Sequence, residues 1–122
     1  MELNEALKQL VDLFDEQPTG RALVCLPHDR HVSRAMQDVL AMLSEKGKRN
    51  FKGRHMPAQL IRFNEGGRIY FRHGQHDGVA MRGVHVDRAA IIDVASLAHP
   101  AVMAEFERST EKCDPKNVFY CS

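Results

Sequence analysis

A chain of 122 residues with 43% hydrophobic and 27% charged side chains is long enough to bury one core, and this composition excludes a disordered chain or a coiled coil. No apolar run could span a bilayer, and the N-terminus is acidic where a signal peptide would be basic, so we expect one cytoplasmic domain, residues 1–122, without a membrane partner. The formal net charge of +1 neither favours nor excludes nucleic acid as a partner.

The first half of the chain predicts two helices around a strand. Apolar residues at helical spacing indicate an amphipathic helix over residues 3–15. The apolar run 22–26 is typical of a strand that is buried on both faces, as in a parallel sheet. A second helix is expected at about 30–45, and residues 46–55 are expected to form a basic loop.

A β-hairpin is predicted next. Two apolar segments, 60–63 and 68–71, flank Asn64, Glu65 and two glycines, which tolerate the positive φ of a tight turn. The mostly polar segment 73–83 contains three glycines and is expected to be a mobile loop.

The last third predicts a strand, a helix and a strand. The apolar run 89–92 ends in Asp93, a helix follows at about 100–110, and 117–121 forms a final strand. Helices that alternate with buried strands favour a three-layer α/β domain with a mostly parallel sheet.

The sequence contains no intact phosphate-binding loop. A P-loop needs a glycine five residues before the glycine of the Gly-Lys pair and a Ser or Thr directly after the pair. The only such pair, Gly47-Lys48, has Met42 and Arg49 at those two positions. We therefore expect no cofactor and no ATP hydrolysis by this chain alone.

Asp93 has two interpretations. An Asp at the carboxyl end of a buried parallel strand lies where α/β sheets bind ligands, and in P-loop ATPases it helps to hold Mg²⁺. Alternatively, Asp93 caps the turn that follows the strand. Val94 stands where many such ATPases have a catalytic Glu.

Histidines in two loops offer a possible metal site, because imidazole and carboxylate groups suit Zn²⁺ or Mn²⁺. The alternative is that they are surface polar residues. The loop residues concerned are His28, Asp29, His31, His73, His76 and Asp77.

The basic segment 46–55 contains no acidic residue, and cations there could contact phosphates while an aromatic ring stacks on a base. The alternative is a solvated loop with Phe51 folded inward. The nucleic-acid candidates are Lys46, Lys48, Arg49, Phe51, Lys52 and Arg54.

In order along the chain, these segments resemble the ATPase domain of bacteriophage large terminases, the motors that package DNA. Residues 23–30 resemble the strand and loop after the P-loop helix, and 61–71 resembles the family's hairpin. Residues 81–83 and 89–95 resemble an Arg-Gly pair and the Walker B strand, and 117–122 resembles the coupling strand. The resemblance implies a reduced RecA-like fold of the P-loop NTPase type.

Three departures from the family bear on function. The P-loop and the nuclease domain have no counterpart in these 122 residues, and Val94 replaces the catalytic Glu. Arg82 matches an Arg that is thought to reach the nucleotide of a neighbouring subunit, where it stabilises charge on the transferred phosphate.

Three functions follow as hypotheses. The first is a non-enzymatic phage-type protein, a pseudo-ATPase that binds a protein partner, itself or nucleic acid. The second is a metal-dependent hydrolase or nuclease that uses Asp93 with the loop His and Asp residues. The third is a subunit that donates Arg82 to the site of another ATPase.

Overall fold

The computed structural model describes residues 1–122 and contains a six-stranded sheet. The strands are β1 (Arg21–Leu26), β2 (Phe51–His55), β3 (Leu60–Phe63), β4 (Arg68–His73), β5 (Ala89–Asp93) and β6 (Val118–Cys121). They lie in the order β2-β3-β4-β1-β5-β6. Strands β4, β1, β5 and β6 are parallel, while β2 and β3 are antiparallel to their neighbours. The expected sheet is confirmed, but it is mixed rather than mostly parallel.

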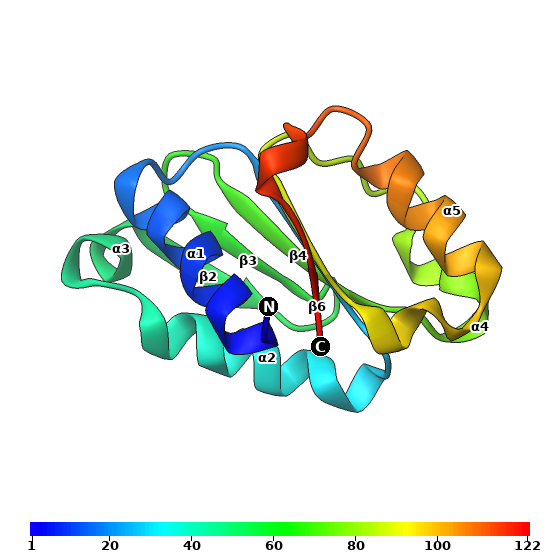
Figure 1. The fold of residues 1–122 in the computed structure, drawn as a ribbon. Coiled ribbons are helices and arrows are strands. Elements are labelled where there is room, and N and C mark those ends of the chain that lie inside the picture. The colour runs from blue at the N-terminus through cyan, green and yellow to red at the C-terminus, as the bar shows by residue number, and fades with distance from the viewer.

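Helices cover both faces of the sheet, as Figure 1 shows. The α-helices are α1 (Leu3–Glu16), α2 (Asp29–Met42), α3 (Glu45–Asn50), α4 (Gln75–Gly78) and α5 (Pro100–Ser109). Short 3₁₀ turns are η1 (Val79–Met81), η2 (Val94–Ala98) and η3 (Pro115–Asn117). Helices α1 and α2 pack on one face and α5 packs on the other, which confirms the three-layer α/β architecture. None of the helices has the length and hydrophobicity that a membrane-spanning segment needs.

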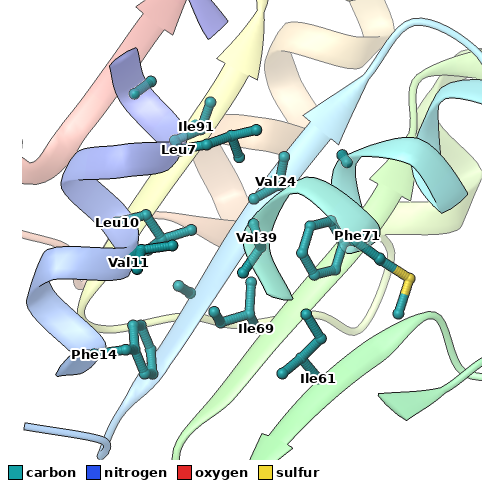
Figure 2. Close-up of a cluster of buried hydrophobic side chains, with 14 of the residues drawn as sticks. Leu7, Leu10, Val11, Phe14, Val24, Val39, Ile61, Ile69, Phe71 and Ile91 are labelled. Atoms are coloured by element: carbon teal, nitrogen blue, oxygen red, sulfur yellow. The ribbon is translucent and has the colours of Figure 1, made fainter. Parts of the chain in front are cut away.

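The larger core lies between the sheet and helices α1 and α2 (Figure 2). Successive side chains of a strand point to opposite faces, so Ile69 and Phe71 of β4 enter this core while Tyr70 faces α5. Phe14 of α1 stacks on Phe63 of β3, with ring centroids 5.2 Å apart. This core therefore connects α1 to the hairpin half of the sheet.

The smaller core lies under α5, where Val102 and Phe106 pack on β1 and β5. Cys25 belongs to this core, and burial raises the pKa of its thiol to about 12. Burial also raises the pKa of Cys113 and of Cys121 to about 11. All three cysteines are free and buried, and these raised pKa values keep the thiols protonated at neutral pH.

Arg88, which the sequence analysis did not single out, connects β5 to the end of α1. Its guanidinium donates hydrogen bonds to the carbonyl oxygens of Leu13, Gln17 and Thr19. It also lies over the ring of Phe14, 4.7 Å from the centroid. Partial burial lowers the pKa of Arg88. Its side chain thus satisfies carbonyl groups that the helix leaves free.

Residues 46–55 do not form the expected loop, because they are divided between α3 and β2. Ser44 caps α3, and its Oγ accepts a hydrogen bond from the N–H of Gly47 at 3.2 Å. A Cβ at Gly47 would collide with the carboxylate of Asp15, which accepts a hydrogen bond from the N–H of Ser44 at 3.2 Å. A glycine is therefore needed at position 47 for α3 to pack on α1. This packing explains the Gly47-Lys48 pair, and no phosphate-binding role is needed to account for it.

The segment 73–83 is not one open loop: it contains the short elements α4 and η1, although His76 and Asp77 inside α4 have left-handed φ and ψ values. The glycines here allow close packing: Gly74 approaches Ser96, and Gly78 approaches the backbone of Val102. Met81 of η1 is fully buried. His76, however, has a φ of 53°, a left-handed conformation that is uncommon for residues other than glycine.

Candidate functional site

Asp93 lies at the carboxyl end of β5, as the sequence predicted, and it caps η2. Its Oδ1 accepts a hydrogen bond from the N–H of Ala95 at 3.0 Å. Asp93 also lines a pocket of about 190 Å³ between the end of β1 and α2, together with His31 and Arg34. The side chain therefore makes the structural contact that the capping interpretation requires. The exposed Val94 supplies no second carboxylate beside it.

The structure brings the two histidine loops together at this same edge of the sheet. The N–H of Asp29 donates a hydrogen bond to Oε1 of Gln75 at 3.1 Å, and Oδ1 of Asp29 accepts one from Nε2 of Gln59 at 2.9 Å. His28 caps α2, since its Nδ1 accepts a hydrogen bond from the N–H of Arg30 at 3.1 Å. Hydrogen bonds therefore already engage Nδ1 of His28 and Oδ1 of Asp29, two atoms that a metal ion would need as ligands.

The remaining candidate ligands are spread out. Nδ1 of His73 is buried without a hydrogen-bond partner, and His76 is exposed. Asp77 pairs with His99, with Oδ1 and Nε2 2.9 Å apart. Nowhere do three or more His, Cys, Asp or Glu side chains gather closely enough to hold a metal ion. The geometry gives no support to the metal-dependent hydrolase.

Arg82 follows η1 and is mostly exposed, with 62% of its side chain accessible. Its Nε lies 3.5 Å from Oε1 of Glu105, which also accepts hydrogen bonds from Arg108 at 3.0 Å. Arg82 would have to leave this weak ion pair with Glu105 before its side chain could extend toward another subunit. The donation of Arg82 to a second ATPase stays a prediction.

The basic residues of 46–55 lie on the outer side of α3 and along β2. Lys46, Lys48 and Arg49 of α3 are exposed, as is Lys52 of β2, while Arg54 is half-buried. Phe51 is half-buried and packs against the larger core, so its ring is committed to the fold rather than to stacking on a base.

Charge is strongly segregated between this part of the chain and the rest. Residues 46–73 contain eight of the 17 Lys and Arg residues but only one of the 16 Asp and Glu residues. This segment, which forms most of α3 and all of β2, β3 and β4, therefore has a formal charge of +7. The remaining residues have a formal charge of −6. The net charge of +1 is therefore the sum of a strongly basic half of the sheet, strands β2, β3 and β4, and an acidic remainder.

Three arginines line up across neighbouring strands of this half. Arg62 of β3 pairs in register with Arg68 of β4, and Arg68 pairs in register with Arg21 of β1. Partners in register share a face of the sheet, so the three side chains lie on the face that α5 covers further along. None of them makes an ion pair, and Nε of Arg62 is buried without a hydrogen-bond partner. We call these three residues the arginine row.

The arginine row and α3 are connected through the hairpin turn. Asn64 donates a hydrogen bond from its N–H to the carbonyl oxygen of Asn50 at 2.7 Å and from Nδ2 to that of Arg49 at 3.3 Å. The end of α3 therefore lies beside Asn64, at the start of the turn between β3 and β4. We use the name basic surface for α3, β2, β3 and β4 together with Arg21.

No protein-family model matches this chain, and neither a curated protein nor a solved structure matches it.

Proposed function

We propose that this protein binds nucleic acid through its basic surface. The main support for this proposal is the arginine row, three aligned cations without an ion pair. Like charges directly opposite each other on neighbouring strands destabilise a sheet. Neither Arg62, Arg68 nor Arg21 has an acidic partner that offsets this cost. A backbone of phosphates would neutralise the whole row at once.

Binding without hydrolysis fits the other features of the chain. The Walker A motif and the catalytic Glu are missing, and Asp93 already caps a turn. The resemblance to the terminase ATPase domain supports a reduced RecA-like relative that has kept a binding role. Strands β5 and β6, which resemble the Walker B and coupling strands, are neighbours in the sheet. A phage-type DNA-packaging context is part of this proposal.

A double charge reversal on α3 tests the proposal. We expect Lys48→Glu with Arg49→Glu to weaken binding of a fluorescent DNA by at least about tenfold at low salt, because two exposed cations of the basic surface become anions. Fluorescence anisotropy measures the change. Arg30→Glu is the control, since Arg30 is exposed at the start of α2, at the end of that helix far from α3, and makes no ion pair. Equal affinities for the double variant and the control would contradict the proposal and would point to a protein partner instead.

A further inference from the structure

A groove begins where the arginine row ends. A hollow of about 200 Å³ is lined by Arg21, His85, Val86, Asp87 and Lys112. A second hollow, of about 290 Å³, is lined by Arg108, Ser109 and Glu111 together with three of the same residues, His85, Val86 and Lys112. Because they share these residues, the two hollows adjoin, and we call them together the groove; Arg21 lines the first of them.

The groove differs chemically from the arginine row. The cations Arg21, Arg108 and Lys112 line it, but so do the carboxylates of Asp87 and Glu111. Oδ1 of Asp87 accepts a hydrogen bond from the N–H of Arg21 at 2.9 Å, while Glu111 makes no ion pair. A site that places carboxylates among its cations does not suit phosphate alone. It does offer both donors and acceptors, which the edge of a nucleobase requires.

His85 is placed to complete such a site. It is exposed and lies in the wall that the two hollows share. Histidine is one of the side chains on which unpaired bases stack in proteins that bind single strands. A base in a duplex is stacked and paired, so it cannot enter a groove beside His85 without leaving the helix.

We infer that the groove takes an unpaired base of a single-stranded nucleic acid whose phosphates lie on the arginine row. The inference rests on the proposed function and specifies its ligand. The carboxylates accept hydrogen bonds from exocyclic amino groups, which cytosine has and thymine lacks. The groove therefore favours cytidine over thymidine in the strand that it binds.

Three fluorescent DNA probes of about 16 nucleotides, near the upper end of known single-strand site sizes, test this inference: oligocytidine, oligothymidine and a duplex of mixed sequence. We expect wild-type protein to bind oligocytidine most tightly and the duplex least. His85→Ala should weaken binding of single strands by about fivefold or more, since stacking on one base contributes that much or more, and should leave the duplex unchanged. His31→Ala, an exposed histidine on α2, is the control. Glu111→Leu should abolish the preference for cytidine without weakening oligothymidine.

The outcomes separate the inference from the proposed function. Duplex binding at least as tight as single-strand binding would overturn the inference while the proposed function stands. The same holds if His85→Ala behaves like His31→Ala, or if wild-type protein binds the two single strands equally. Failure of wild-type protein to bind any of the three probes would remove both.

Discussion

Replacing Arg68 by glutamate is expected to stabilise the fold and to weaken nucleic-acid binding at the same time. Arg68 lies between Arg62 and Arg21 in register, so Arg68→Glu converts two like-charge pairs into two opposite-charge pairs. We expect the free energy of unfolding to rise by about 0.5–1 kcal/mol. Affinity for single-stranded DNA should fall by about tenfold, and the dependence of log affinity on log salt should lose about 0.7 in slope for the lost phosphate contact.

Stability and DNA affinity are both measured on the Arg68→Glu variant. Urea denaturation gives the change in stability, and anisotropy titrations at several salt concentrations give the change in affinity and slope. A charge reversal that merely damages the fold would lower both quantities. The account is contradicted if Arg68→Glu is less stable than wild-type protein or binds DNA as tightly. Arg30→Glu should change neither quantity appreciably.

Replacing Phe14 by alanine is expected to cause the largest loss of stability among single changes on α1. Phe14 is fully buried, stacks on Phe63 and lies under the guanidinium of Arg88. Phe14→Ala removes these contacts and leaves a cavity, so we expect a loss of about 3–5 kcal/mol in the free energy of unfolding. Losses of this size are a large fraction of the stability of an ordinary domain.

A conservative variant checks the cause. Phe14→Leu keeps most of the buried volume but removes the aromatic pair and the cation–π contact, so its loss should be clearly smaller than that of Phe14→Ala. Urea denaturation monitored by circular dichroism measures both. A loss below about 1 kcal/mol for Phe14→Ala would show that α1 contributes little to the core.

The regular elements with strong periodicity could be predicted from the sequence. The helix expected at 3–15 is α1, and the run 22–26 is β1, because burial on one face or on both leaves a local pattern of apolar residues. The hairpin was predicted from its turn residues. The segments with many glycines were misjudged. Gly47 and Gly74 are there because Asp15 and Ser96 approach closely, and such tertiary contacts leave no local signal.

The candidate site was predictable only in part. Asp93 was expected at the end of a strand, and that position is confirmed. The basic character of 46–55 was visible, but the inward packing of Phe51 was left open. The arginine row was missed, because the pairing of Arg68 with Arg21 depends on the parallel register of β4 and β1, which lie far apart in the sequence. The groove at His85 was missed because its walls come from segments far apart in the sequence, at residues 21, 85–87 and 108–112.

The salt dependence of wild-type binding to a single-stranded DNA tests the central claim most directly. With three arginines on phosphates, we predict that log affinity falls linearly with log salt with a slope of about −2 or steeper between about 50 and 200 mM. Binding that is absent at low salt, or that does not change with salt, would contradict a nucleic-acid function for the basic surface.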